Sequence, residues 1–272
     1  MKVPTFVKWA GGKKQLIEQF KPLFPKKIER YFEPFVGGGA VAFYIVKQYK
    51  PKEVFLSDTN PELINCLNVI RTKVDELIKL LEKYKKKHNK ETYYKVRAED
   101  PTLLDDVSRA ARFIYLNKTC FNGLYRVNSK GQFNVPIGSY KNPSIYSEED
   151  LREISELLKN AKLEVKQFYE IAKETKAGDF IYFDPPYHPL KKGKSFTAYT
   201  KEAFLEKEQE KLAEVFKELD KGGCLVMLSN SDTEFIKNLY KGYNRTFVKA
   251  SRMINCDSSK RGKINEVVVI NY

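Results

Sequence analysis

RYFEPFVGGGAVAFYIVKQYKPKEVFLSDTN (residues 30–60) is the stretch from which the fold can be predicted. Residues 30–36 are short and aromatic-rich and predict a strand, and the three glycines after them predict a turn before a helix over AVAFYIVKQY. Residues 53–57 (EVFLS) predict a second strand. Asn60 then suits the N-cap of a helix that has Pro61 at its first position. Two strand–helix units in succession favour an α/β fold with a parallel sheet.

The pattern changes between residues 62 and 146. Up to Lys118 the chain shows only helical periodicity, and residues 119–146 are rich in Asn, Gly, Pro, Ser and Tyr. A loop of that length inside a compact domain is usually functional. The strand–helix alternation then returns, with helices expected over 147–160 and 201–219 and strands over 162–167, 179–184, 223–229 and 264–272. We therefore predict a domain made of residues 1–61 and 147–272, interrupted by a helical and loop-rich block, residues 62–146.

Composition limits the class of protein. Hydrophobic residues make up 42% of the 272 residues and charged residues 31%, which excludes wholesale disorder and a bundle of membrane helices. No apolar run approaches the roughly 18 residues of a membrane span, and the N-terminus lacks the apolar stretch of a signal peptide. We therefore expect a cytoplasmic protein with no membrane partner.

The charge balance points to a polyanionic partner. Lys and Arg number 49 against 35 Asp and Glu, a surplus of +14, and half of that surplus lies in the block 62–146. Such a surplus favours nucleic acid or an acidic membrane surface, although a lysine-rich surface alone would produce it too. Four cysteines without a CxxC pair and only two histidines argue against a structural zinc site and favour reduced, buried thiols.

The glycine-rich turn is the first candidate site. Gly37, Gly38 and Gly39 would let the backbone approach a ligand closely, and the next helix would present free N–H groups. Asp58 ends the second strand 21 residues after Gly37, where a carboxylate can accept hydrogen bonds from ribose hydroxyls. This pairing fits either a dinucleotide or S-adenosylmethionine.

The second candidate site is Asp184-Pro185-Pro186-Tyr187, directly after the apolar residues 180–183. Because neither proline has an N–H, the strand must stop pairing there, at the carboxyl end of the sheet where α/β folds bind ligands. Asp184 adds an acceptor beside the free carbonyls and Tyr187 adds a stacking face. These groups suit a planar ring with an exocyclic amine, whose lone pair is drawn toward an electrophile when both its hydrogens are held.

The sequence resembles the DNA adenine methyltransferase (Dam) family, whose members methylate the exocyclic amine of adenine with S-adenosylmethionine. The resemblance covers nearly the whole chain and rests on six segments: FVKWAGGK (6–13), YFEPFVGGGA (31–40), SDTNPELIN (57–65), FNGLYRVNSKGQFNVPIGSYKNP (121–143), DPPY (184–187) and SSKRGK (258–263). Their order is that of the family's alpha arrangement, and FNGLYRVNSKGQFNVP is especially similar to the bacterial methylases that modify GATC. The resemblance implies a Rossmann-like methyltransferase sheet with an inserted DNA-recognition domain at 62–146.

The resemblance also implies roles for individual residues. The expected cofactor-binding residues are Trp9, Lys13, Glu33, Phe35, Gly37, Gly38, Gly39, Asp58 and Asp184, and the catalytic motif is Asp184, Pro185, Pro186 and Tyr187. The expected DNA-binding residues are Lys8, Phe121, Asn122, Leu124, Arg126 and Pro136.

Physical chemistry supports the expected DNA contacts. The target adenine must leave the duplex at a cost of a few kcal/mol, and an aromatic wedge such as Phe121 offsets part of that cost. Arg126 suits a guanine edge, although an arginine can equally contact a phosphate. Ser139 lies where close relatives often have an arginine, so one DNA contact is in doubt. Residues 196–199 (FTAY) and Ser229–Asn230 are expected to line the target pocket.

Three alternatives stay open from the residues alone. An NAD-dependent dehydrogenase would use Gly37 and Asp58 but would leave the DPPY motif unexplained. A methyltransferase for RNA, for cytosine amines or for another DNA sequence shares the chemistry. A DNA-binding module without activity would not need both Asp58 and Asp184. We therefore expect a monomeric enzyme that methylates adenine in double-stranded DNA, within GATC, with or without a separately acting restriction endonuclease as its counterpart.

Overall fold

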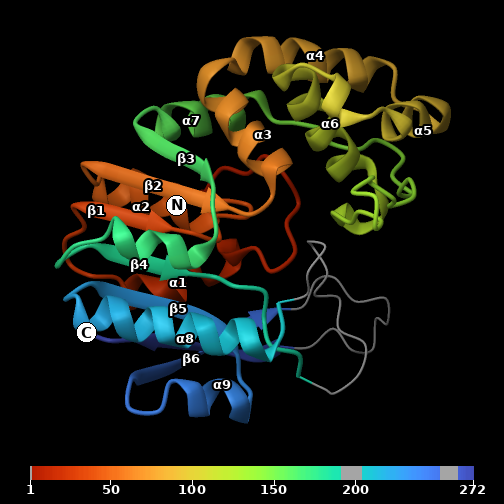
Figure 1. Ribbon diagram of the computed structural model, residues 1–272. Coiled ribbons are helices and arrows are strands. Elements are labelled where there is room, and N and C mark those ends of the chain that lie inside the picture. Colours follow the sequence, from red (N-terminus) through yellow and green to blue (C-terminus); the bar gives the residue numbers. More distant parts are fainter. Residues whose placement is uncertain (1, 191–203, 252–262) are drawn as a thin grey trace.

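The computed structural model describes residues 2–190, 204–251 and 263–272, and its centre is a seven-stranded sheet (Figure 1). The strands run in the order β3-β2-β1-β4-β5-β7-β6. β1 to β5 are mutually parallel, while β7 is antiparallel to both of its neighbours. The predicted α/β class is confirmed. The strands are β1 Arg30–Glu33, β2 Glu53–Asp58, β3 Ala161–Val165, β4 Phe180–Phe183, β5 Leu225–Ser231, β6 Asn244–Ser251 and β7 Lys263–Ile270.

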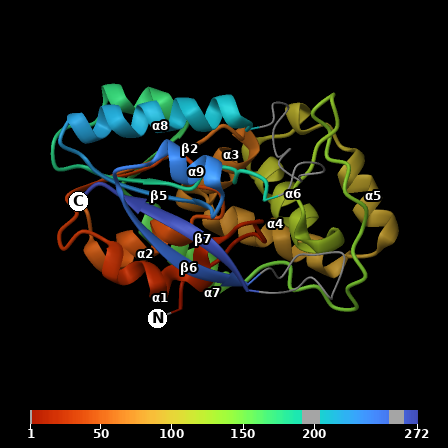
Figure 2. The ribbon, with the colours of Figure 1, turned by 90° about the horizontal axis from the view of Figure 1, so that it is seen from below.

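Helices cover both faces of this sheet, as Figure 2 shows. Alternate residues of one strand enter opposite cores, because side chains of a strand point to opposite faces. Phe180 and Tyr182 of β4 pack in the core beneath α1, α2 and α7, while Ile181 and Phe183 pack against α8. The helices are α1 Ile17–Phe20, α2 Ala40–Tyr49, α3 Pro61–Thr72, α4 Val74–Lys86, α5 Lys90–Ala98, α6 Asp106–Thr119, α7 Glu148–Leu158, α8 Glu206–Lys221 and α9 Glu234–Leu239.

The block 62–146 forms a helical lobe beside the sheet (Figure 1). α4, α5 and α6 lie in this lobe, and α3 joins it to the sheet because α3 packs on α6 as well as on β2, β3 and α7. Buried residues of the lobe, such as Tyr93 and Ile114, belong to the same apolar core as Tyr31 and Val54 of the sheet. The lobe therefore shares one continuous core with the sheet.

The strand order reverses between β1 and β4. From β1 the chain moves outward to β2 and β3, whereas β4 lies on the other side of β1 and continues to β5. In open α/β sheets, ligands bind where the order reverses, at the carboxyl ends of the strands. The segments after Glu33 and after Phe183, which carry the glycine turn and the DPPY motif, start at this point.

Apart from shifts of up to two residues at other strand and helix ends, the local predictions differ from the structure at β1, β6 and α8. β1 ends at Glu33 rather than at residue 36, because Pro34 has no N–H to pair. β6 was not predicted. It is the outermost strand at one edge of the sheet, and because Phe247 in it is 51% exposed, its hydrophobic residues do not form the pattern of a buried strand. α8 begins at Glu206 rather than near residue 201. The predicted cap is confirmed, since Asn60 Oδ1 accepts from the N–H groups of Glu62 and Leu63.

Two further observations concern the classes considered from composition. In the part of the chain that the structure describes, no helix is long and apolar enough to cross a membrane, and no three metal-binding side chains gather at one place. Cys66, Cys120 and Cys224 are buried free thiols, as expected, and burial raises the pKa of the Cys66 thiol well above its usual value.

Candidate functional site

The glycine turn is shaped by Trp9. Gly37 has φ +46° and Gly39 has φ +71°, conformations that residues with side chains rarely adopt. A Cβ atom on Gly37 would lie 2.7 Å from Trp9 Nε1, and one on Gly38 would lie 3.0 Å from Trp9 Cβ. The indole thus lies directly against the turn, and only glycine fits beneath it.

Asp58 at the end of β2 is bonded to the same turn. The Gly37 N–H donates to Asp58 Oδ2 over 3.1 Å, and the Asn60 N–H donates to Asp58 Oδ1 over 3.0 Å. A carboxylate has about four acceptor sites, so each oxygen can accept a further hydrogen bond. Burial raises the pKa of Asp58 to about 6, against the lowering effect of these backbone donors.

Asp184 at the end of β4 is held on one oxygen. Lys13 Nζ lies 2.7 Å from Asp184 Oδ1, and Ser229 Oγ donates to the same atom over 3.1 Å. Because the Ser229 proton goes to Asp184, the Tyr182 hydroxyl donates to Ser229 over 2.7 Å. Within residues 2–190, 204–251 and 263–272 both partners of the carboxylate bond Oδ1, which leaves Oδ2 for another donor.

Lys13 is a charged neighbour that influences the pKa values of Asp184 and Glu33, and its side chain is only 4% exposed. Burial raises the pKa of Asp184, while the neighbouring ammonium opposes this rise. Burial raises the pKa of Glu33 well above its usual value, and the charge of Asp184 adds to this rise. The Lys13 ammonium thus favours the ionised form of Asp184, whereas burial favours the protonated form of Glu33.

The Tyr187 ring is held from two sides. Lys13 Nζ lies 4.6 Å from the centre of the ring, and the hydroxyl donates to the Glu266 carboxylate over 2.7 Å. The turn after β4 is fixed as well, because the buried Gln209 side chain donates to the Pro186 carbonyl over 2.9 Å and in turn accepts from Asn230. Gln209 and Glu266 were not predicted from the sequence, because they lie 23 and 79 residues from their partners.

An aromatic cluster lies beside the end of β1. The Phe35 ring stacks on Phe168 with their centres 5.4 Å apart, and Phe204 meets Phe35 edge-on at 5.7 Å. Phe168 follows β3, whose last residue pairs with Asp58. Phe168 was not predicted, although an aromatic residue just after a strand of the expected parallel sheet is a signal that could have indicated it.

Apart from Lys8, the expected DNA-binding residues lie on one irregular hairpin. Isolated bridges pair Cys120 with Ile137 and Val127 with Phe133, and the Phe121 N–H donates to the Pro136 carbonyl over 2.9 Å. The Phe121 side chain is 43% exposed, which suits a wedge. Among the other expected residues, Asn122 has φ +55°, Leu124 is half-buried, and Arg126 is exposed with Nε bonded to Asn134. Pro136 and Ser139 are exposed.

Lys8 is joined to this hairpin by Asn117, a buried residue that the sequence analysis missed. Asn117 Oδ1 accepts from the Lys8 N–H over 2.7 Å, while Nδ2 donates to the carbonyls of Lys8 and Gly123. The Lys8 ammonium lies 4.1 Å from the centre of the Tyr140 ring. The N-terminal segment that carries Lys8, Trp9 and Lys13 therefore connects the hairpin to the two acidic sites.

The structure thus brings the expected residues together in two groups. The expected cofactor and catalytic residues surround the ends of β1, β2 and β4. The expected DNA contacts lie on the lobe, except for Lys8, which Asn117 joins to it. Ser229 and Asn230, expected at the target pocket, are buried at the end of β5 beside Asp184 and the turn after it. Residues 196–199 and 258–262 lie outside the described residues.

Comparison with known proteins places the chain in a family. A family model described as D12 class N6 adenine-specific DNA methyltransferase matches residues 9–254. Type II methyltransferase M.MjaIII from Methanocaldococcus jannaschii is 46% identical over 289 residues and is aligned over 100% of both chains. A DNA adenine methylase from Serratia marcescens is 34% identical, over 98% of this chain and 97% of its own. Among solved structures, a methyltransferase from Pyrococcus furiosus aligns with 97% of this chain and 85% of its own at a TM-score of 0.39 and 13% identity. The chain therefore belongs to the D12 class of N6 adenine-specific DNA methyltransferases.

Proposed function

We propose that this enzyme transfers a methyl group from S-adenosylmethionine to the N6 amine of adenine in double-stranded DNA, within GATC. The observation that carries the chemistry is the arrangement of Asp184 at the end of β4. Its Oδ1 is held by Lys13 and Ser229, so Oδ2 is oriented and available beside the Tyr187 ring.

The residues at the ends of β1 and β2 fit S-adenosylmethionine. Gly37 and Gly38 let the Trp9 indole pack directly on the turn, and Asp58 beside that turn keeps acceptor sites for ribose hydroxyls. The stacked rings of Phe35 and Phe168 offer a flat face for an adenine ring. When bound, S-adenosylmethionine supplies an electrophilic methyl group on its sulfonium.

The protein's own groups prepare the amine. Asp184 Oδ2 and the Pro185 carbonyl accept its two hydrogens, which turns the nitrogen lone pair out of conjugation with the ring. Tyr187 stacks on the base, and its hydroxyl is tied to Glu266 so that the ring keeps its orientation. The proton that the methylated amine must lose goes to the Asp184 carboxylate, since burial raises the pKa of that group.

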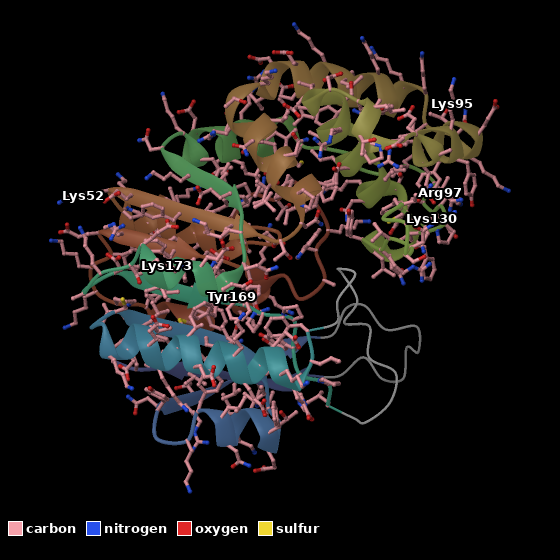
Figure 3. All side chains as sticks on the ribbon, viewed as in Figure 1. Lys52, Lys95, Arg97, Lys130, Tyr169 and Lys173 are labelled. Atoms are coloured by element: carbon pink, nitrogen blue, oxygen red, sulfur yellow. The ribbon has the colours of Figure 1, made fainter. Side chains whose placement is uncertain are left out.

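We propose that residues 62–146 form the target-recognition unit. Their net charge of +7 favours the DNA backbone, and Figure 3 shows the labelled side chains of Lys95, Arg97 and Lys130 on this lobe. Phe121 and Asn122 occupy the space left by the flipped adenine. Lys8 and Arg126 each read one guanine of the palindrome.

The thymine next to the flipped adenine is read without hydrogen bonds. Leu124 and Pro136 on the hairpin contact its methyl group. GATC is a palindrome with one adenine in each strand, so a monomer acts on the two strands in separate events. The matched relatives include a type II methyltransferase, and a separately acting restriction endonuclease is the counterpart that such a role requires.

The test uses plasmid DNA that lacks adenine methylation, treated with the enzyme and S-adenosylmethionine. It should become resistant to a nuclease that cuts only unmethylated GATC and sensitive to one that requires methylated GATC. Adenine methylation mapped to another motif would overturn the GATC assignment and leave the chemistry standing. A methylated cytosine, or methylation of RNA alone, would overturn the proposal as a whole.

A further inference from the structure

Tyr125 points away from the DNA-reading side of the hairpin. It lies between Leu124 and Arg126, and Arg126 is exposed whereas the Tyr125 side chain is largely covered. Its ring packs against Phe113 of α6 and Phe133 of the hairpin, with the ring centres 5.2 Å and 5.8 Å apart. The Tyr125 ring is therefore directed into the protein, although both of its sequence neighbours, Leu124 and Arg126, are expected to read bases.

The ring also contacts the cofactor side of the site. Tyr125 stacks on Trp9, with the ring centres 6.0 Å apart and the planes at 30°. Trp9 in turn lies against Gly37, where an added Cβ would be 2.7 Å from its Nε1 atom. A continuous stack thus runs from the base-reading hairpin to the glycine turn.

The hydroxyl makes a second connection, to the ribose-binding acid. The Asn60 side chain lies close enough to the Tyr125 hydroxyl to oppose the rise of its pKa, and the Asn60 N–H donates to Asp58 Oδ1. Asn60 Oδ1 already accepts two backbone N–H bonds, so Nδ2 is the amide atom that suits the hydroxyl. Burial raises the pKa of Tyr125 to about 12, so the hydroxyl stays neutral at working pH.

We propose that Tyr125 is a positioning residue that couples cofactor binding at Gly37 and Asp58 to the base-reading arrangement of Leu124 and Arg126. A ligand that fixes Trp9 and Asp58 also fixes Asn60, which is bonded to Asp58, and therefore both neighbours of Tyr125, so the hairpin is already ordered when DNA arrives. The coupling must be reciprocal: bound GATC DNA raises the affinity for cofactor by the same factor by which the cofactor raises the affinity for DNA. This inference rests on the proposed function, since it assumes that the two sites take cofactor and DNA.

The experiment measures that factor by binding alone. Fluorescence anisotropy gives the Kd for a GATC duplex with and without saturating S-adenosylhomocysteine, which cannot donate a methyl group. We expect S-adenosylhomocysteine to lower the Kd of the wild-type enzyme for the GATC duplex at least about fivefold, within the range usual for coupled sites. A duplex with one base pair of GATC changed should show a smaller factor, because Leu124 and Arg126 are not engaged.

Two variants separate the two connections. Tyr125→Phe keeps the stack on Trp9 and loses the hydroxyl beside Asn60, so its coupling factor should fall at least about twofold below that of the wild type while staying above unity. Tyr125→Leu loses both connections and should show no coupling. Tyr94→Phe is the matched control: this α5 tyrosine contacts Tyr93 and Arg97, so its factor should remain that of the wild type.

The outcomes distinguish this inference from the proposed function. If Tyr125→Phe melts at the wild-type temperature and keeps the full coupling factor, the inference is wrong. It is also wrong if product and DNA bind the wild-type enzyme independently while methylation of adenine proceeds. If the wild type binds no cofactor and methylates no DNA, the proposed function itself has failed.

Discussion

Asp184→Asn is the substitution that tests the chemistry most selectively. Asparagine has the same shape, and its carbonyl oxygen can still accept from Lys13 and Ser229, which bond Oδ1 in the wild type. Its NH2 group then lies where Oδ2 should accept a hydrogen of the target amine. Two donors would face each other at the reacting nitrogen.

The expected loss is in turnover. Removing one oriented hydrogen-bonding group from an active site lowers kcat by roughly 10²- to 10³-fold, equal to about 2.7–4 kcal/mol. Stability should also fall, because the Lys13 ammonium loses its counter-charge. Removing one charge of a buried pair lowers the free energy of unfolding by up to about 3–5 kcal/mol. Because the asparagine retains an acceptor for Lys13, we expect a smaller decrease, of about 2 kcal/mol. For a chain of 272 residues that corresponds to a drop in Tm of about 3–4 °C.

A second ion pair in the same chain supplies the control. Asp179 lies just before β4, 3% exposed, with Oδ2 at 2.6 Å from Arg30 Nη1, and it is remote from the DPPY motif. Asp179→Asn should lower the Tm at least as much and leave kcat unchanged. The assays are single-turnover transfer of labelled methyl groups and a thermal melt of each variant. A kcat for Asp184→Asn within tenfold of the wild type would remove Asp184 from the chemistry.

Three further predictions concern the cofactor and the flipped base. Burial raises the pKa of Asp58 to about 6, so its carboxyl group is protonated below that pH and loses acceptor capacity; the Kd for S-adenosylmethionine, measured by calorimetry, should therefore rise as the pH falls through 6. Asp58→Asn should bind S-adenosylmethionine at least about tenfold more weakly at pH 8, with a Kd that does not change with pH. A wild-type Kd that is equally independent of pH would contradict the assignment. Gly37→Ala should weaken cofactor binding at least tenfold because its Cβ meets Trp9, whereas Gly131→Ala, which has positive φ but open space around it, should not. Phe121→Ala should reduce the fluorescence rise of 2-aminopurine placed at the target adenine, and an unchanged rise would show that this ring does not stabilise the flipped state.

The parts of the site that were predictable are those coded within short segments. Gly37 follows a strand and Asp58 ends the next one, and both positions can be read from local pattern because parallel strands place their carboxyl ends together. The N-cap at Asn60 is also a local signal, and the structure confirms it.

The parts that were missed depend on contacts between distant residues. Asn117 looks like any polar helix residue, yet it is buried because it bonds Lys8, 109 positions away. Tyr125 stands in the segment that led to the family, but its inward orientation follows from the packing of Trp9 and Phe113, which no local pattern reports. β6 was missed because it is an edge strand, which needs hydrophobic residues on only one face and so lacks the continuous apolar run of the central strands.

The central claim is that this chain methylates N6 of adenine with S-adenosylmethionine, and one measurement tests it most directly. A duplex with a single GATC is incubated with the enzyme and S-adenosylmethionine that carries a deuterated methyl group, then digested to nucleosides for mass spectrometry. The account predicts the deuterated methyl group on N6 of adenine alone, formed at the wild-type rate in Asp179→Asn and roughly 10²- to 10³-fold more slowly in Asp184→Asn. Label on cytosine, or no label in any nucleoside from the wild type, would contradict it.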